Sequence, residues 1–153
     1  MKPVKLIEKS KILLGGFRVG GEKEGVNHWE KFETQEAIEK LHNAVDMQGC
    51  EVRAYPQNPA DEWIFTGVEV TDRVVLPAYE LLTLPAATYA VFDINCKKKT
   101  QRQFDGIDKW LEKNKDSYIQ GEWDGAPYVV CWYGRMSNEK VFEMWVPLTA
   151  HNL

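Results

Sequence analysis

The sequence is poor in the residues that carry disulfide and metal chemistry. Its 153 residues include three cysteines and three histidines. Cys50, Cys96 and Cys131 are an odd number at wide spacings and form no Cys-x-x-Cys pair, a pattern typical of reduced thiols in a cytoplasmic protein. The histidines form no His-Glu-x-x-His motif. We therefore expect no disulfide, no metal site and no cofactor.

Long apolar runs are also missing. No stretch approaches the ~18 uncharged apolar residues of a transmembrane helix. The first residues, MKPVKLIEKSK, lack the continuous apolar core of a secretory signal. The net charge of −4 and the isoelectric point of about 5.4 disfavour non-specific binding to nucleic acid or anionic lipid. These features predict a cytoplasmic protein with neither a membrane nor nucleic acid as a direct partner.

Motifs that carry catalysis are absent as well. The glycine pairs at 15–16 and 20–21 lack the following Lys-Ser/Thr of a phosphate loop, and there is no Gly-x-Ser-x-Gly. The carboxylate pairs Asp61-Glu62 and Glu122 with Asp124 fall in predicted turns, where solvated side chains are usual. The motifs alone therefore identify no catalytic residue.

Aromatic residues are abundant. Six Trp, six Tyr and six Phe make up 12% of the chain, and apolar residues make up 44%. This composition and length fit one folded domain, residues 1–153, that buries a core without covalent staples. Aromatic residues dominate many cores, so their function depends on where they lie along the predicted elements.

The hydrophobic pattern predicts a mixture of strands and helices. Extended segments are expected over 5–19, 50–55, 63–70, 79–84, 88–93, 128–133 and 141–148. Helices are expected over 27–46, with a break near 33–34, and over 100–113. The second helix places Phe104, Ile107, Trp110 and Leu111 on one apolar face.

The order of these elements indicates an internal duplication. Residues 1–72 and 73–153 each read strand, helix, strand, turn, strand, with 50–55 corresponding to 127–132 and 67–70 to 145–148. We expect an α+β fold of two βαββ repeats with pseudo-twofold symmetry. An antiparallel sheet and two helices would enclose a ligand cleft between the halves.

Four segments, taken in order, carry a family resemblance. They are FTGVEV at 65–70, LPAATYAVF at 84–92, Trp110-Leu111, and FEMWVPL at 142–148. This ordered set resembles the GyrI-like domain, the effector-binding domain of AraC-type and MerR-type multidrug regulators in the SOUL-like superfamily. HWEKF at 28–32, together with the later GVEV strand, is similar to the stand-alone branch known from integron cassettes. The individual motifs are not specific, whereas their order and spacing are.

The resemblance implies a function. Members of the family bind lipophilic, often cationic, compounds between aromatic walls, with an acidic residue of the last strand at the pocket floor. Glu143 matches the acidic position and Trp145 a wall position. The DNA-binding part of the regulators has no counterpart here. The resemblance therefore implies a stand-alone protein for drug or effector binding or sequestration, with a separate regulator or a second copy as candidate partner.

A second activity stays open at this point. One subfamily hydrolyses the strained cyclopropane rings of DNA-alkylating natural products inside an aromatic cage. In that alternative Glu143 would be the catalytic acid or base.

Strand alternation defines the candidate site. Glu143 and Trp145 share one face of the last strand, and Trp63 and Phe65 share one face of the equivalent strand in the first half. A lipophilic cation would compensate a buried carboxylate, and each aromatic face would add on the order of 0.5–2 kcal/mol. A structural bridge from Glu143, and plain core packing of each aromatic, are the alternatives. The predicted ligand-binding residues are Glu143, Trp145, Phe65, Trp63, Tyr89, Tyr133, Phe17, Trp29 and Tyr55.

Overall fold

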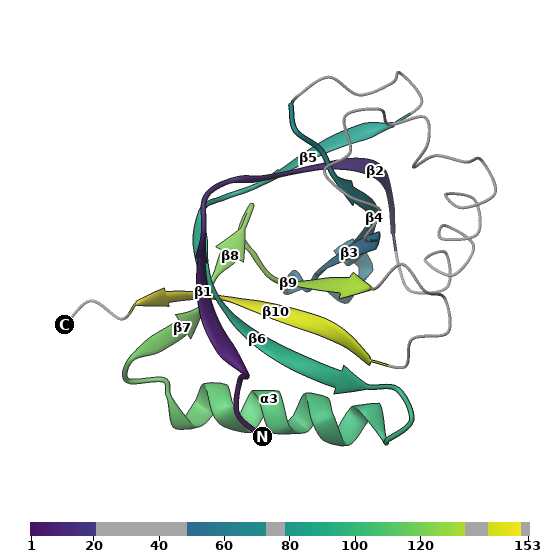
Figure 1. The fold of residues 1–153 in the computed structure, drawn as a ribbon. Helices are drawn as coiled ribbons and strands as arrows, with labels where there is room; N and C mark the ends of the chain where they lie inside the picture. The colour runs from purple at the N-terminus through teal and green to yellow at the C-terminus, as the bar shows by residue number, and fades with distance from the viewer. Residues whose placement is uncertain (21–48, 73–78, 134–140, 151–153) are drawn as a thin grey trace.

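A strongly curled antiparallel sheet forms most of the molecule, and a single described α-helix lies across its outer face (Figure 1). The computed structural model describes residues 1–20, 49–72, 79–133 and 141–150. The predicted helix over 27–46, and Trp29 within it, lie outside the described residues. The sheet and the helix together confirm the predicted α+β class for the described part of the chain.

Ten described strands make up the sheet. They are β1 (Lys5–Lys9), β2 (Ile12–Gly20), β3 (Gly49–Ala54), β4 (Trp63–Glu69), β5 (Glu80–Leu84), β6 (Ala87–Asn95), β7 (Tyr118–Gln120), β8 (Glu122–Trp123), β9 (Ala126–Tyr133) and β10 (Val141–Ala150). Their order is β1-β6-β10-β9-β3-β4-β2-β5, with β7 on β10 and β8 on β9. The extended segment predicted over 5–19 is two strands, because the chain leaves β6 after Lys9 and pairs with β4 and β5 from Ile12 onward.

The strand order bears on the predicted duplication. The two halves meet at the pair of β3 and β9. From this pair the sheet continues outward through β4 and β2 of the first half on one side, and through β10 and β6 of the second half on the other. The described residues include one helix of the two that the repeat requires, α3 (Thr100–Lys113). The second helix and the pseudo-twofold symmetry are therefore not established and stay predictions.

Side-chain hydrogen bonds fix both ends of helix α3. Gln103 joins the helix to the end of β6, because its side chain accepts a hydrogen bond from the Asn95 N–H at 2.8 Å and donates one to the Asn95 carbonyl at 2.9 Å. Asn114 ends the helix by donating from its side chain to the Trp110 carbonyl at 2.8 Å. The helix has 14 residues, and no helix in the described ranges is long and apolar enough to cross a membrane.

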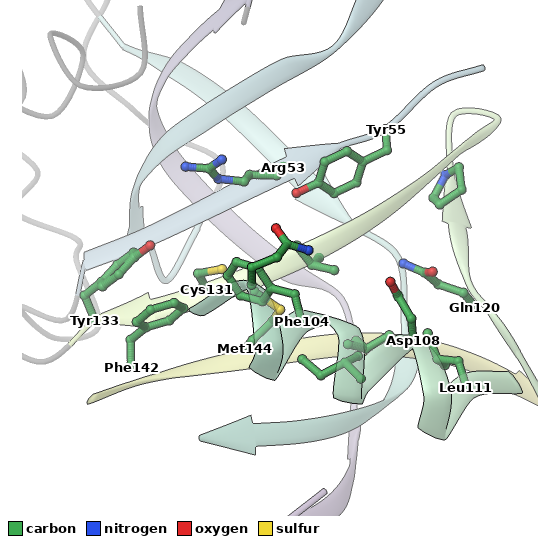
Figure 2. A pocket seen from close by; sticks show the side chains of 15 residues that line it. Arg53, Tyr55, Phe104, Asp108, Leu111, Gln120, Cys131, Tyr133, Phe142 and Met144 are labelled. Atoms are coloured by element: carbon green, nitrogen blue, oxygen red, sulfur yellow. The ribbon is translucent and has the colours of Figure 1, made fainter. Parts of the chain in front are cut away.

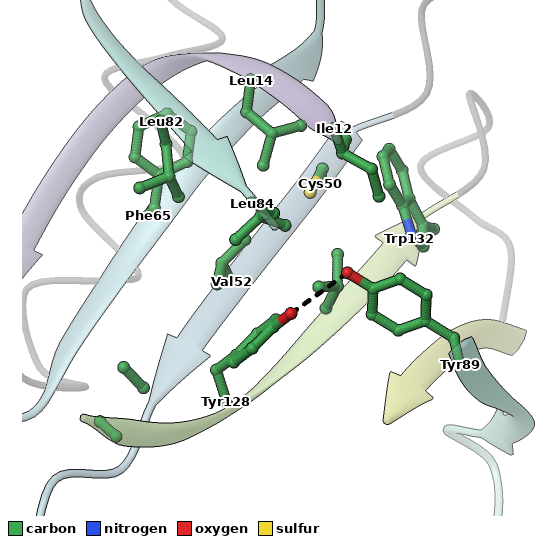
Figure 3. Packing of buried hydrophobic residues seen from close by; sticks show 13 residues of the cluster. Ile12, Leu14, Cys50, Val52, Phe65, Leu82, Leu84, Tyr89, Tyr128 and Trp132 are labelled. Atoms are coloured by element: carbon green, nitrogen blue, oxygen red, sulfur yellow. Dashed lines mark hydrogen bonds between the residues drawn. The ribbon is translucent and has the colours of Figure 1, made fainter. Parts of the chain in front are cut away.

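Apolar side chains pack on both faces of the sheet. The inner cluster, inside the curl, includes Leu14, Val52, Phe65, Leu84 and Tyr128 (Figure 3). The outer cluster joins the sheet to α3 and contains Phe92, Ile94, Ile107, Met144 and Val146. Phe104, Trp110 and Leu111 pack against it, which confirms the predicted apolar face of the helix.

Candidate ligand-binding site

A cavity of about 660 Å³ lies between α3 and the outer face of β3, β9 and β10 (Figure 2). Its apolar walls include Phe104, Ile107 and Leu111 of the helix and Val129, Met144 and Val146 of the sheet. Its size falls within the range of small-molecule pockets, which is roughly 300–1,000 Å³.

Strand alternation directs the polar lining into this cavity. In β3 the buried residues Cys50, Val52 and Ala54 belong to the inner cluster, so Arg53 points to the outer face. On β9, Cys131 and Tyr133 line the cavity in the same way. Arg53, Cys131 and Tyr133 therefore form a polar part of the sheet wall of the cavity.

An ion pair holds the positive charge in this group. Arg53 Nε–H donates to Oε1 of Glu51, a carboxylate that is only 4% exposed. Burial alone would lower the pKa of Arg53, but Glu51 more than offsets this, so that the pKa is raised. The guanidinium therefore stays charged, and Glu51 neutralises it.

The neighbouring acids are uncharged at neutral pH. Burial raises the pKa of Tyr133, and it raises the pKa of Cys131 to about 12, with Glu51 adding to both shifts. Both groups can take part in hydrogen bonds here, but neither supplies a negative charge.

A carboxylate without a partner lies on the helical side of the cavity. Asp105, Asp108 and Glu112 are three and four residues apart and so form one stripe along α3. Asp105 accepts a hydrogen bond from Gln101 at 3.0 Å, and Glu112 pairs with Lys115. Asp108 lines the cavity and has no ion pair or hydrogen bond within the described ranges.

Aromatic rings complete the lining. The Tyr133 and Phe142 ring centroids are 5.0 Å apart, and both residues line the cavity. Tyr55, directly after β3, lies at the cavity and is 41% exposed. These rings and Asp108 are the groups that could attract a cation.

Comparison with known proteins shows which solved structures share this fold. No family model matches the chain, and no curated protein matches it either. Among solved structures, SAV2435 bound to tetraphenylphosphonium is similar with a TM-score of 0.66 and 15% identity, over 95% of this chain and 93% of that one. The EcmrR C-terminal domain has a TM-score of 0.63 and 13% identity, over 95% and 96%. The chain therefore shares the fold of these two proteins, in agreement with its resemblance to GyrI-like domains.

Two further matches agree with this fold. In the complex of EcmrR with DNA, the similar region is 56% of the EcmrR chain, with a TM-score of 0.63 and 13% identity over 94% of this chain. The integron cassette protein VCH_CASS2 from Vibrio cholerae has a TM-score of 0.52 and 14% identity, over 95% of both chains. The structural likeness establishes a shared fold, and identities this low do not establish a shared ligand.

The predicted ligand-binding residues fall on two faces of the sheet. Tyr55 and Tyr133 line the cavity. Glu143 lies on the opposite side of β10, because its neighbours Phe142 and Met144 are the ones that line the cavity. Trp145 lies beside Glu143 on this inner side and donates from Nε1 to the Glu143 carboxylate at 3.3 Å.

The inner side holds most of the other predicted aromatics. The Trp145 ring lies 5.5 Å from that of Tyr89 and 5.2 Å from that of Trp132. Tyr89 and Phe65 are fully buried, and the Tyr89 hydroxyl lies 3.3 Å from that of Tyr128 (Figure 3).

The remaining two make other ring contacts, and Trp63 does so while packing on the inner cluster. Trp63 packs edge-on against Trp123 at 5.4 Å, with the Arg18 guanidinium 5.2 Å from its ring. Phe17 packs edge-on against Tyr79 at 4.9 Å. The structure thus groups Glu143, Trp145 and Tyr89, and it separates them from Tyr55 and Tyr133.

Three charged residues at or beside the cavity were not predicted from the sequence. Glu51 and Arg53 alternate with apolar residues in the GCEVRA segment, and a charged face on an interior strand is a detectable signal. Asp108 belongs to a stripe that is visible once α3 is drawn as a helix. The family resemblance implied Glu143 and Trp145 of the last strand instead.

Proposed function

We propose that this chain binds lipophilic cations in the cavity between α3 and the sheet. The observation that carries the proposal is a cavity of about 660 Å³ with apolar and aromatic walls and a carboxylate, Asp108, that has no partner among the residues that the structure describes. Apolar burial would supply most of the affinity, at roughly 25 cal/mol per Å² removed from water. SAV2435, which has the same fold, is described as bound to tetraphenylphosphonium, and this supports the ligand class.

Charge selects between ligands of similar shape. Arg53 is neutralised by Glu51, so Asp108 is the uncompensated charge of the described lining. Because Asp108 is exposed, its preference for a cation is small, about 0.5–1 kcal/mol. The Tyr55 and Tyr133 rings add cation–π attraction, which also favours a positively charged ligand.

The inner group of Glu143, Trp145 and Tyr89 is a second place where such a ligand could bind. Glu143 and Trp145 are half-buried, and three aromatic rings surround the carboxylate side of β10. Glu143 and Trp145 are the two residues that match the site of the resembled family, and we keep Trp63, Phe65, Phe17 and Trp29 as further candidate ligand-binding residues. The outer cavity is preferred because the Glu143 carboxylate already accepts a hydrogen bond from Trp145.

We further propose that the chain acts as one stand-alone, cytoplasmic binding domain with halves at 1–72 and 73–153. A separate regulator, or a second copy of the chain, would be the partner that senses the bound ligand.

Isothermal titration with two ions of matched shape tests the proposal. Tetraphenylphosphonium should bind more tightly than tetraphenylborate, which has the same shape and the opposite charge. Asp108→Asn should weaken phosphonium binding about two- to fivefold. Asp105→Asn is the matched control, because it removes a charge from the same stripe outside the cavity lining.

Two results would overturn the proposal. Equal affinity for the two ions would remove the role of charge. Loss of binding in Glu143→Gln, with Asp108→Asn unchanged, would move the site to the inner side of β10.

A further inference from the structure

Helix α3 carries charges of opposite sign on two of its edges. Asp105, Asp108 and Glu112 form the acidic edge beside the cavity, whereas Lys109 and Lys113 lie about a quarter of the way round the helix. A separate groove of about 440 Å³ runs along this basic edge. It is distinct from the cavity, since the two share no lining residue.

The floor of the groove is apolar and firmly held. Trp110 is half-buried, packs on the outer cluster, and meets the Phe92 ring edge-on at 5.7 Å. Gly106 has no side chain, which leaves room for Met1; a Cβ at Gly106 would lie 3.0 Å from the Met1 Cβ. The Met1 side chain covers part of the helix and is itself 56% exposed.

The rim of the groove is positively charged. Lys2, Lys109 and Lys113 line it, and within the described residues none of them has an ion pair. Three neighbouring ammonium groups repel one another and favour a partner that carries carboxylates.

An open sheet edge begins beside this groove. Among the described strands, β1 pairs with β6 alone, so its other edge presents unpaired backbone N–H and C=O groups. Figure 1 shows the N-terminal end of the chain against α3, with β1 leading away from it.

The strand and the residue before it carry exposed apolar side chains. Val4 and Leu6 are 58% and 46% exposed, while Ile7, the next residue along β1, packs on the inner cluster. Alternation therefore places Leu6 on the side of the sheet that α3 covers.

We propose that Lys2, Val4, Leu6, Lys109 and Lys113 form a docking surface, the β1–α3 surface, for an acidic extended segment of a partner protein. The segment would pair with the free edge of β1, place apolar side chains on Val4 and Leu6, and direct carboxylates at the three lysines. Leu6 and α3 lie on the same side of the sheet, and side chains two residues apart in a strand share a side. The segment that fits this surface therefore carries both its apolar residues and its carboxylates at every second position, with the carboxylates at the end nearer the groove.

The same charges disfavour other occupants. If two copies of the chain paired through β1, Lys5 and Lys9 of one copy would face lysines of the other copy. Like charges directly across a strand pair are destabilising. Nucleic acid is disfavoured by the net charge of −4 and by the exposed apolar residues on the surface.

Fluorescence polarisation with designed peptides tests this proposal. A labelled peptide with Val, Val, Glu and Glu at every second position and Thr between them, the Glu-Val peptide, should bind, and its counterpart with Lys in place of Glu should not. The double variant Lys109→Glu/Lys113→Glu should lose about tenfold or more in affinity. Arg102→Glu is the control, because Arg102 is an exposed basic residue of the same helix that does not line the groove.

Hydrogen exchange locates the contact. Backbone amides of β1 should gain protection when the Glu-Val peptide is bound, and tetraphenylphosphonium affinity should stay unchanged in the double variant, which separates this surface from the cavity. Failure of the Glu-Val peptide to bind, equal binding of the two peptides, tighter binding of a DNA oligonucleotide, or an equal loss in Arg102→Glu would each overturn the proposal.

Discussion

At the scale of single residues, burial decides which thiols can react. Burial raises the pKa of Cys50, with Cys131 and Glu51 adding to the effect, and raises the pKa of Cys131 to about 12. Cys96 is exposed. Since the thiolate is the reactive form, Cys50 and Cys131 should stay protonated and shielded at pH 8.

A disulfide-exchange reagent at pH 8 should therefore modify one thiol per chain rapidly in the native state. Cys96→Ser should abolish this fast reaction, and all remaining thiols should react after denaturation in urea. Fast modification of a second thiol in the native protein would show that the β3–β9 pair opens readily.

Glu143 shows how far residue-scale prediction reached. Alternation correctly placed Glu143 and Trp145 on one side of β10 and Phe142 and Met144 on the other. It could not tell which side holds the cavity, because apolar clusters pack on both faces of this strand. Asp108 was missed for a related reason, since only the docking of α3 on the sheet turns an exposed aspartate into a lining residue.

At the scale of elements, periodicity predicted α3 and the longer strands well. It missed β7 and β8, which have three and two residues and are too short to show a period. It also joined β1 to β2, because the change of partner strand after Lys9 is a property of the sheet and leaves little trace in local sequence.

The close contact of β2 with β4 carries a prediction at this scale. Gly16 and Gly67 face each other across the two strands. A Cβ at Gly67 would lie 2.2 Å from the Gly15 carbonyl oxygen, a backbone atom that cannot move without separating the strands. Gly67→Ala should therefore lower the free energy of unfolding by more than about 2 kcal/mol.

Gly125→Ala is the matched control for this measurement in urea. Gly125 has a φ of 79°, and a Cβ added there would meet nothing within 4 Å, so alanine should cost about 1 kcal/mol of backbone strain. A smaller loss for Gly67→Ala than for Gly125→Ala would mean that the strand contact relaxes easily.

At the scale of the whole molecule, the curl of the sheet divides the chain into an inner and an outer environment. Trp123 of β8 helps to hold the curl, because its Nε1–H donates to the Thr83 carbonyl of β5 at 3.0 Å, far along the sheet order. The inner space is then filled by aromatic side chains such as Tyr89, Tyr128 and Trp132 (Figure 3). The outer face keeps a cavity beside α3.

This division allows one spectroscopic measurement to locate the ligand. Tyr55 and Tyr133 line the outer cavity, whereas Trp132 and Trp145 belong to the inner side. In protein labelled with fluorotyrosine, tetraphenylphosphonium should shift the fluorine resonances of Tyr55 and Tyr133, assigned by Tyr→Phe variants. In protein labelled with fluorotryptophan, the resonances of Trp132 and Trp145 should change little.

A shift of the tryptophan resonances without a shift of the tyrosine resonances is equally informative, because the sheet separates the rings of the outer cavity from those of the inner side. A shift at Trp145 that Glu143→Gln abolishes would place the cation against the inner aromatic group. The Glu143 carboxylate would then have to give up its hydrogen bond from Trp145 Nε1, so the Trp145 resonance should move most. Tetraphenylborate serves as the control in both labelled samples, since a ring shift that follows shape alone should appear with either ion.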